Sequence, residues 1–230
     1  MIVQLDNRLQ AIVDLAEAGA PAADIGTDHA YLALALIRSG KSPHVIAGDK
    51  NEGPYLAACR TVKSAGMEHE IEVRLGDGLQ PLLPGEASVL CIAGMGGQLI
   101  TRILTDSPEV TAQARQLILQ PMNAARELRR WLYASGWYLA EEALAEADGR
   151  IYQILSARKG AAPMPEDILL EIGPLLWEKK PPLLRRHIEE RLARARKAVS
   201  GMKQSAHALG SPKYTEFTHR IKELEERLLW

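Results

Sequence analysis

Four short stretches of the chain combine acidic residues with glycines, and together they have the composition of a nucleoside-binding site. Carboxylates accept hydrogen bonds from ribose hydroxyls and amino groups, while glycines let the backbone approach a ligand closely. The stretches are "ADIGTDH" with Asp24, Gly26, Asp28 and His29; "GDK" with Asp49 and Lys50; "GDG" with Asp77 and Gly78; and "AGMGG" with Ala93, Gly94, Met95 and Gly96.

The acids argue against a dinucleotide ligand. The first stretch has one glycine, Gly26, where a dinucleotide fingerprint has three, and Asp28 would repel a phosphate at that turn. S-adenosylmethionine has no phosphate, and its sulfonium and amino groups are cations that a carboxylate attracts. The pattern therefore predicts S-adenosylmethionine as cofactor. Asp49, which follows Gly26 by 23 residues, is expected to accept from the ribose hydroxyls, and Asp77 from the adenine amino group.

Each of these residues also has a purely structural interpretation. Asp24 and Asp28 could cap the helix that follows them, because Asp is a preferred N-cap residue. Asp49 could serve only the turn after its strand, and "GMGG" could be a flexible turn. The joint arrangement at successive strand ends favours the ligand site.

Alternating strands and helices position these stretches. Apolar runs predict strands at 21–26, 44–49, 70–78, 88–94 and 115–121, the fourth of them continuously apolar and therefore central. Helical periodicity predicts helices at 7–19, 30–40, 53–66, 97–107 and 123–136. Residues 137–160 break the alternation and predict two strands joined through "ADGR", a β-hairpin signal.

This order predicts an α/β fold with a parallel sheet, helices on both faces and an antiparallel hairpin at the end. Five parallel strands and a closing hairpin are the inventory of the class I, Rossmann-like S-adenosylmethionine methyltransferase sheet. We assign residues 1–159 to this cofactor-binding catalytic domain. Residues 160–230 have helical periodicity only, with two apolar stripes joined at "GSP", and are predicted to form a coiled-coil-like helical hairpin.

The motifs resemble those of a known family. "ADIGTDHAYL", "AGDKNEGPY", "VRLGDGL", "IAGMGG", "LILQP" and "DGRIYQIL" look like the bacterial TrmK-type tRNA (adenine-N1)-methyltransferases. The resemblance covers residues 1–159 closely and the helical tail more loosely. It implies S-adenosylmethionine-dependent methylation of N1 of the adenosine at position 22 of tRNA.

The resemblance also suggests which residues face the acceptor base. Methylation at N1 needs no strong base, because neutral adenine already has a lone pair there. A carboxylate beside the base would stabilise the cationic product, and Asp28 and His29 are the candidates in the first loop. Asp6 and Arg8 resemble family positions that face the acceptor, although Asp6 could equally be the N-cap of the first helix.

Charge is unevenly distributed along the chain. The net charge is −1 overall, but residues 1–159 carry −4 and residues 160–230 carry +3. Basic residues in the tail could contact the tRNA backbone or could form an ordinary solvated helix face. They are Lys179, Lys180, Arg185, Arg186, Arg191, Arg194, Arg196 and Lys197. "RELRRWL", with Arg126, Arg129 and Arg130, is predicted to be a second basic site.

Other features set the cellular context. The two cysteines, Cys59 and Cys91, lie in apolar runs and are expected to be buried free thiols; no spacing typical of a metal site is present. Neither a signal peptide nor a membrane span is visible, so we expect a cytoplasmic protein. The sequence leaves the oligomeric state open, and a monomer is compatible with it.

Two further functions remain open at this stage. A methyltransferase for another RNA or a small molecule would share the sheet and the cofactor site, although the basic tail disfavours a small substrate. A non-catalytic RNA-binding protein could keep the fold, but it would not need acids at three strand ends. The target nucleotide and atom rest on the resemblance alone.

Overall fold

We analysed a computed structural model of the chain, which describes residues 5–204 and 206–230. The chain divides into two compact units, Met1–Met164 and Pro165–Trp230. The first unit contains a seven-stranded sheet, and the second is entirely helical.

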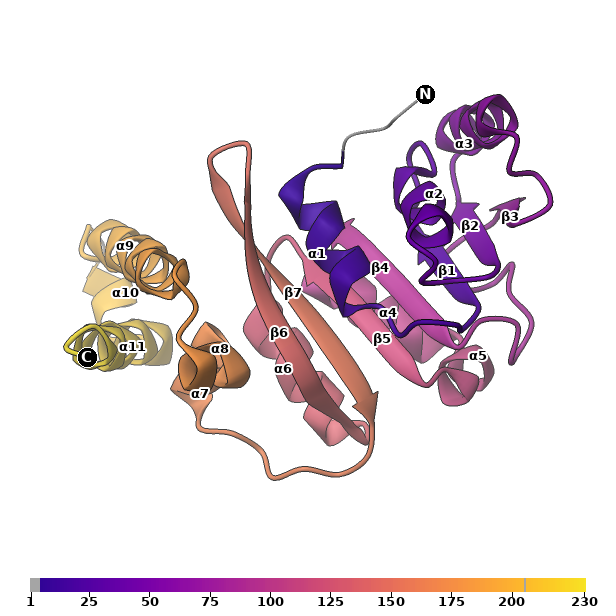
Figure 1. Ribbon diagram of the computed structural model, residues 1–230. Coiled ribbons are helices and arrows are strands. Elements are labelled where there is room, and N and C mark those ends of the chain that lie inside the picture. Colours follow the sequence, from indigo (N-terminus) through magenta and orange to yellow (C-terminus); the bar gives the residue numbers. More distant parts are fainter. Residues whose placement is uncertain (1–4, 205) are drawn as a thin grey trace. The chain divides into compact units, whose positions relative to one another are not determined.

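The sheet of the first unit has the strand order β3-β2-β1-β4-β5-β7-β6, in which β1 to β5 are parallel and β7 and β6 are antiparallel (Figure 1). The strands are β1 (Ala22–Ile25), β2 (Val45–Asp49), β3 (Ile71–Leu75), β4 (Val89–Met95), β5 (Gln116–Pro121), β6 (Trp137–Ala147) and β7 (Arg150–Lys159). The predicted class I methyltransferase sheet is therefore confirmed.

Helices cover both faces of this sheet, as Figure 1 shows for α1 and α2 in front and α4 and α6 behind. The helices of the first unit are α1 (Asn7–Leu15), α2 (Tyr31–Arg38), α3 (Glu52–Ala65), α4 (Gly97–Asp106), α5 (Pro108–Gln113) and α6 (Ala125–Ala134). Sequence periodicity predicts one helix between β4 and β5; the structure has two, because Pro108 begins a new helix at its first turn.

The centre of the sheet carries the site. Strand β4 lies between β1 and β5, as its continuous apolar run predicts, and its first four residues are buried. The pairing of β4 with β5 is irregular between Ala93 and Met95, where Gly94 has a φ of 73°. Such a bulge bends the strand and redirects the residues that follow. The loop after β4 is thereby turned over the edge of the sheet.

Helix α1 ends before the predicted Gly19. Ala16 adopts an extended backbone, and the last carbonyls of α1 accept hydrogen bonds from side chains instead of from a further turn. Lys41 Nζ donates to the carbonyls of Asp14 and Ala16, and Gln116 Nε2 donates to that of Leu15. These partners are distant in sequence, so local periodicity does not reveal them.

The predicted hairpin turn is present, with Asp148 and Gly149 both at positive φ. The hairpin holds α6 through a buried polar cluster. Arg129 Nε donates to Glu142 at 2.7 Å and Arg129 Nη2 donates to Gln153 at 2.8 Å, with Arg129 fully buried. The prediction that Arg129 belongs to a basic surface is therefore wrong; its charge is neutralised inside the fold.

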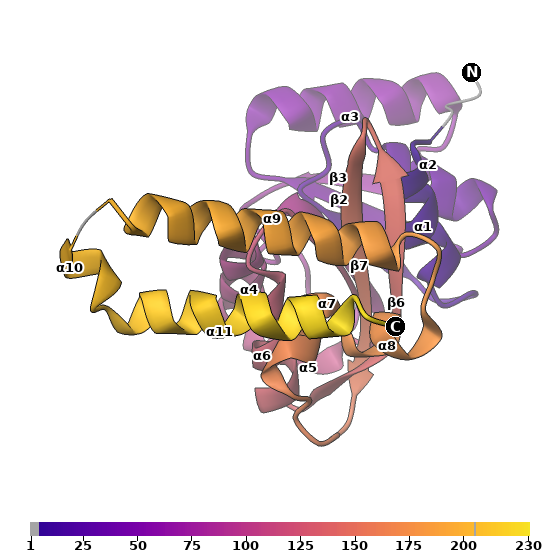
Figure 2. The ribbon, with the colours of Figure 1, turned by 90° about the vertical axis from the view of Figure 1, so that its left-hand side faces the viewer.

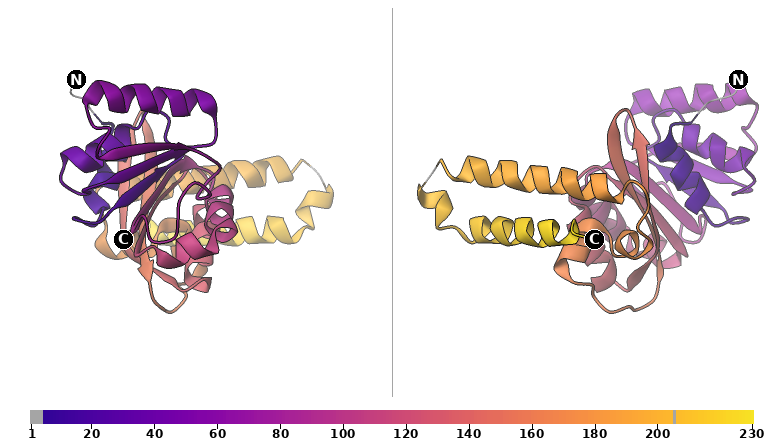
Figure 3. Two further views of the ribbon diagram at one scale, coloured as in Figure 1. Left: turned by 90° about the vertical axis from the view of Figure 1, so that its right-hand side faces the viewer. Right: turned by 60° about the vertical axis from the view of Figure 1, so that its left-hand side comes forward.

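The second unit is built on an antiparallel helix pair. Helices α9 (Leu184–Met202) and α11 (Pro212–Arg227) lie side by side, with the short α10 (Ala206–Leu209) at the tip (Figures 2 and 3). Helices α7 (Asp167–Ile172) and α8 (Pro174–Lys179) precede them. The predicted helical hairpin is confirmed. Over residues 5–204 and 206–230, no helix is both long and apolar enough to cross a bilayer.

Candidate functional site

Two cavities open at the carboxyl ends of the parallel strands, and they share Gly26, Ala93 and Gly94. We call the first the nucleoside cavity; it has a volume of about 190 Å³ and lies among the ends of β1, β2, β3 and β4. We call the second the acidic cavity; it has a volume of about 390 Å³ and lies between the start of α1 and the loop after β1. Ligands of open α/β sheets bind at this edge.

The predicted site residues are distributed over both cavities, with one exception. Asp49, Lys50, Asp77, Gly78 and Met95 line the nucleoside cavity. Asp6, Arg8, Asp24, Asp28 and His29 line the acidic cavity. Gly96 lines neither of them. A Cβ on Gly96 would lie 3.0 Å from the Asn123 side chain, and one on Gly97 would lie 2.5 Å from the Ala124 carbonyl. These two glycines allow close packing of α4 against the loop after β5.

Asp49 has a structural role as well as a place in the cavity. Its Oδ1 accepts hydrogen bonds from the Asn51 backbone N–H at 2.7 Å and from Asn51 Nδ2 at 3.1 Å. Its backbone carbonyl accepts from Gly76 N–H, which ties the β2 end to the loop after β3. Asp49 therefore stabilises the turn after its strand, and its carboxylate also borders the nucleoside cavity.

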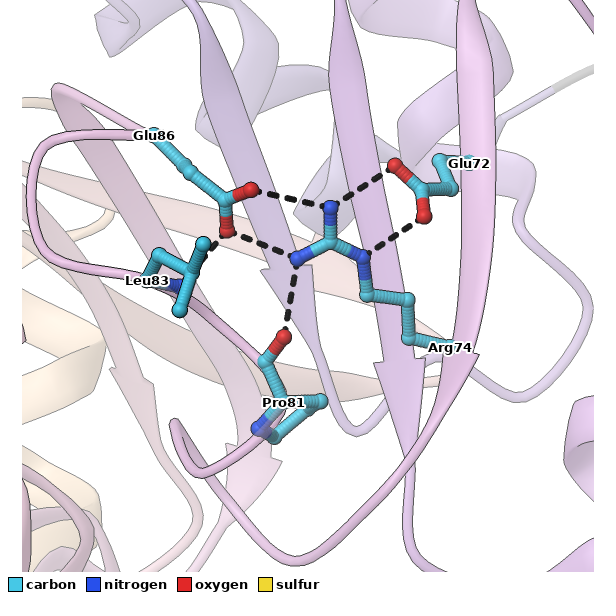
Figure 4. Close-up of polar contacts among 5 residues, drawn as sticks. All are labelled: Glu72, Arg74, Pro81, Leu83 and Glu86. Atoms are coloured by element: carbon cyan, nitrogen blue, oxygen red, sulfur yellow. Dashed lines mark hydrogen bonds and ion pairs between the residues drawn. The ribbon is translucent and has the colours of Figure 1, made fainter.

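The loop after β3, which carries Asp77, is held by one arginine (Figure 4). Arg74 forms ion pairs with Glu72 at 2.8 Å and Glu86 at 2.7 Å, and Arg74 Nη1 donates to the Pro81 carbonyl at 2.8 Å. Glu86 also accepts from the Leu83 N–H. Arg74 lowers the pKa of both Glu72 and Glu86 through these hydrogen bonds. Both carboxylates thus stay ionised, and the loop from Gly76 to Glu86 is fixed at both sides.

Asp24 is the buried acid of the acidic cavity. Only 5 % of the residue is exposed, and burial raises the pKa of its carboxyl to about 6. Thr27 Oγ1 donates to Asp24 at 2.8 Å and partly opposes that rise. A buried carboxyl next to a cavity gains most from a cationic ligand, because the cation replaces the lost hydration.

Asp28 and His29 do not cap the helix that follows them. The N-cap of α2 is Ala30, in the left-handed conformation at φ 57°, and the Ala30 N–H donates to Thr27 Oγ1. The capping interpretation of Asp28 is therefore wrong, and Thr27 is a site residue that the sequence analysis missed. The Asp28 side chain is 77 % exposed and lies 3.5 Å from His29 Nε2. Both side chains are thus available at the cavity mouth.

Asp6 and Arg8 approach the acidic cavity from the start of α1. Asp6 is the N-cap of α1, since its Oδ1 accepts from the Leu9 N–H at 2.7 Å. Arg8 Nη1 donates to Gln120 Oε1 at 3.0 Å, and the same oxygen accepts from the Gly94 N–H. The buried Gln120 at the end of β5 therefore links α1 to the bulge of β4. Gln120 is a second missed residue; its position at a strand end was the only signal.

The first loop and the loop after β4 meet at Gly26. A Cβ built on Gly26 would lie 2.1 Å from Met95 Cε, and its φ of 79° is itself unfavourable for other residues. Gly26 therefore lets the Met95 side chain lie directly on the backbone of the first loop. Gly26, Ala93 and Gly94 line both cavities, whereas Met95 lines the nucleoside cavity only.

The chemistry of the lining fits an adenosyl sulfonium. Five aspartates line the two cavities, whereas the cations among the lining residues are Arg8 and Lys50. Helix α2 begins with an exposed acid just before it, which disfavours a pyrophosphate. Among the described residues, no group of three or more His, Cys, Asp or Glu could hold a metal ion.

In the second unit, the basic residues of the tail mostly have partners within the unit. Arg191 pairs with Glu171, Arg196 with Glu225 at 2.7 Å, and Arg185 Nη2 donates to the Trp230 carbonyl. Other ion pairs and cation–π contacts involve Arg186, Arg194 and Lys180. Lys179 and Lys197 are exposed. Most of the basic run therefore has partners within the second unit, although six of its eight residues are exposed.

Comparison with known proteins identifies the family of the chain. A family model described as a methyltransferase domain matches residues 5–155. The chain is 33 % identical to a tRNA (adenine(22)-N(1))-methyltransferase of Bacillus subtilis over 98 % of this chain and 94 % of that protein.

Solved structures agree as well. The B. subtilis methyltransferase structure superposes with a TM-score of 0.88 at 33 % identity, covering 99 % of this chain and 100 % of that one. A Streptococcus pneumoniae relative solved in complex with S-adenosyl-L-methionine has a TM-score of 0.87 at 30 % identity, covering 98 % of this chain and 100 % of that one. By its sequence and its fold, the chain belongs to the TrmK-type family of tRNA (adenine(22)-N(1))-methyltransferases.

Proposed function

We propose that the protein transfers the methyl group of S-adenosylmethionine to N1 of adenosine 22 in tRNA. Full-length similarity to the B. subtilis enzyme supports this activity. The observation that carries it in this chain is the set of aspartates from three successive strand ends around two joined cavities. That set suits a cationic adenosyl donor.

The nucleoside cavity would hold the adenosine part of the donor. Asp49 Oδ1 already accepts two hydrogen bonds from Asn51, so Asp49 would accept from the ribose hydroxyls through Oδ2. Asp77, on the loop held by Arg74, would accept from the adenine amino group. Ala93, Gly94 and Met95 supply the opposite wall, and Lys50 and Gly78 complete the lining.

The acidic cavity would hold the methionine part of the donor and the acceptor base. When bound, S-adenosylmethionine supplies a methyl group already activated as a sulfonium. Asp24 would attract the donor's positive charge from its buried position, and Gly26 would allow close approach. Asp28 and His29 at the mouth would face the adenine, where a carboxylate stabilises the positive charge that develops on the methylated ring.

Asp6 and Arg8 would set the acceptor side of this cavity. Arg8 is held by Gln120 and lies over the Tyr152 ring at 5.6 Å, so its guanidinium has a fixed place beside the Asp24 carboxylate. The chain would thus orient the acceptor N1 toward the methyl carbon and exclude water. Orientation of this kind can supply a large share of the reduction in the activation barrier of a bimolecular transfer.

We further propose a division of labour between the two parts of the chain. Residues 1–159 would form the catalytic domain, and the helical residues 160–230 would contact the tRNA backbone through exposed basic side chains of α8 and α9. The target base would have to turn out of the stack to reach the acidic cavity. A tRNA substrate implies a cytoplasmic location.

A direct assay tests the proposal. The protein is incubated with methyl-labelled S-adenosylmethionine and either of two tRNA transcripts, one with adenosine and one with guanosine at position 22. Label is expected in the first transcript only. Equal labelling of both would overturn the assignment of the nucleotide. Tight cofactor binding without labelling of any tRNA would favour another RNA or a small molecule as acceptor.

A further inference from the structure

A third cavity lies between α2 and α3, outside the donor site. It has a volume of about 340 Å³, within the range of small-molecule sites. Leu34 and Ala57 give it apolar surface, Arg38 and Arg60 bring positive charge, and Ser64 brings a hydroxyl group. We call it the α2–α3 groove.

The groove adjoins the acidic cavity. His29 and Tyr31 line both, and their rings are stacked, with centroids 5.2 Å apart and planes inclined by 16°. The Tyr31 residue is 39 % exposed although it stands at the first position of α2. An exposed aromatic pair between two cavities offers a surface on which a base can stack.

The sign of the charge changes at this aromatic pair. The acidic cavity contains Asp6, Asp24 and Asp28, whereas no Asp or Glu among the described residues lines the groove. Arg60 is exposed on α3, and among residues 5–204 and 206–230 no carboxylate forms an ion pair with it. The basic α2–α3 groove therefore favours an anionic group, and the adjacent acidic cavity favours a cationic one.

We propose that the α2–α3 groove binds the tRNA nucleotide adjacent to the target adenosine, with its phosphate held by Arg60 and Arg38. This inference rests on the proposed function, because an extruded base must bring its flanking phosphate to the mouth of the acidic cavity. The exposed Tyr31 ring, which is stacked on His29, is placed to stack on the neighbouring base, and Ser64 is placed to contact its ribose. Phosphate contacts of this kind fix the register of a nucleic acid.

Charge reversal on α3 tests the groove. Arg60→Glu is compared with Lys63→Glu, which makes the same change of charge on the same helix but outside the groove. We expect Arg60→Glu to raise the KM for tRNA about tenfold. The slope of log binding constant against log salt concentration should fall by the equivalent of about one phosphate contact. Lys63→Glu should change either quantity less than about twofold. Thermal melting and S-adenosylmethionine affinity should match wild type in both variants.

Chemically altered tRNA identifies the phosphate. Transcripts are assembled with a single neutral methylphosphonate on either side of position 22 or at a distant phosphate. One of the two flanking substitutions should weaken binding to wild type more than binding to Arg60→Ala, because both changes remove the contact between Arg60 and that phosphate while Arg38 keeps its own. The distant substitution should be additive with Arg60→Ala.

The outcomes separate the two proposals. If Arg60→Glu and Lys63→Glu behave alike, or if both flanking methylphosphonates are additive with Arg60→Ala, the groove does not bind this nucleotide. If wild type methylates no tRNA, the proposed function itself fails. If wild type methylates tRNA but Arg60→Glu has no effect on tRNA binding or on the KM for tRNA, only the proposal that the groove binds a nucleotide is overturned.

Discussion

At the scale of single residues, we expect Asp24 to couple the stability of the free protein to its affinity for the donor. Burial raises its pKa from 3.8 to about 6, so the folded protein favours the protonated carboxyl. Stability from this group is fully present below pH 3.8 and is lost as the pH rises through about 6. Because a pKa difference between the unfolded and folded states contributes to the free energy of unfolding, a rise of this size corresponds to a contribution of about 3 kcal/mol.

Asp24→Asn should therefore separate stability from binding. The amide keeps an acceptor for Thr27 but cannot ionise, so the free variant should not lose stability between pH 5 and pH 7.5, and its melting temperature at pH 7.5 should equal or exceed that of wild type. Its affinity for S-adenosylmethionine should fall roughly 10- to 100-fold at pH 7.5, the range for a hydrogen bond to a charged group.

The pH profile of binding is the control. Wild-type affinity should increase as the pH rises from 5 to 7, because Asp24 ionises with a pKa of about 6, whereas the affinity of Asp24→Asn should be flat over that range. Calorimetric titration at several pH values measures both. Identical profiles for the two proteins would remove Asp24 from donor binding.

Asp49→Ala tests the ribose contact. We expect the free energy of donor binding to weaken by roughly 1–3 kcal/mol, because the ribose hydroxyls lose their acceptor. Asn51→Ala is the matched control, since it removes the side-chain hydrogen bond to Asp49 Oδ1 and leaves the carboxylate in place. An unchanged dissociation constant in Asp49→Ala would contradict the assigned role.

The sequence makes the aspartates of the site visible, because carboxylates after apolar runs are rare enough to stand out. Thr27 and Gln120 are not visible in this way. Thr27, and not the alternative candidate Asp28, accepts from the Ala30 N–H, and this contact depends on the left-handed conformation of Ala30. Gln120 matters through contacts with Arg8 and Gly94, which are distant in sequence. Uncharged side chains with long-range partners carry no local signal.

At the scale of elements, Arg74 is a positioning residue for the loop after β3. It touches no part of the nucleoside cavity, but its ion pairs with Glu72 and Glu86 fix the loop that carries Asp77. Arg74→Ala would leave two carboxylates facing each other without a cation, and the loop would open.

We expect Arg74→Ala to raise the KM for S-adenosylmethionine about tenfold, equivalent to roughly 1.4 kcal/mol, with kcat at saturating donor nearly unchanged. Arg74→Lys should recover part of the loss, because it restores the charge but not the forked geometry. Steady-state kinetics measures both values. A fall in kcat at unchanged KM would show that Arg74 acts on the chemical step instead.

Element types follow from the sequence better than element ends do. The β6–β7 hairpin is readable because "ADGR" places Asp148 and Gly149 in a turn that favours positive φ. The end of α1 cannot be predicted from local sequence, because Lys41 and Gln116, which are distant in sequence, donate the hydrogen bonds that its last carbonyls accept. The position of Arg129 is mispredicted for the same reason, because its partners Glu142 and Gln153 lie on the strands β6 and β7.

At the scale of the whole molecule, positive and negative charge are separated along the chain, −4 in residues 1–159 and +3 in residues 160–230. Five of the acids line the two cavities proposed for the cationic donor, and the exposed bases of α8 and α9 suit the phosphates of the proposed acceptor. Lys179→Glu with Lys197→Glu should therefore weaken tRNA binding and lower its salt dependence by about one to two phosphates, with donor affinity unchanged.

Arg196→Ala is the contrasting variant in that experiment. Arg196 pairs with Glu225 across α9 and α11, so its loss should affect the helix pair rather than the tRNA contact. Filter binding over a range of KCl concentrations distinguishes these cases. If the lysine double variant keeps the wild-type salt dependence, the basic face of the tail is only a solvated surface.

The most direct test of the account is the position and identity of the methylated nucleotide. Wild-type protein, S-adenosylmethionine and an unmodified tRNA transcript are incubated, and the product is digested and mapped by mass spectrometry. We predict one N1-methyladenosine per tRNA, at position 22, and none in a transcript with guanosine there. Methylation at another position or on another atom, or equal methylation of both transcripts, would contradict it.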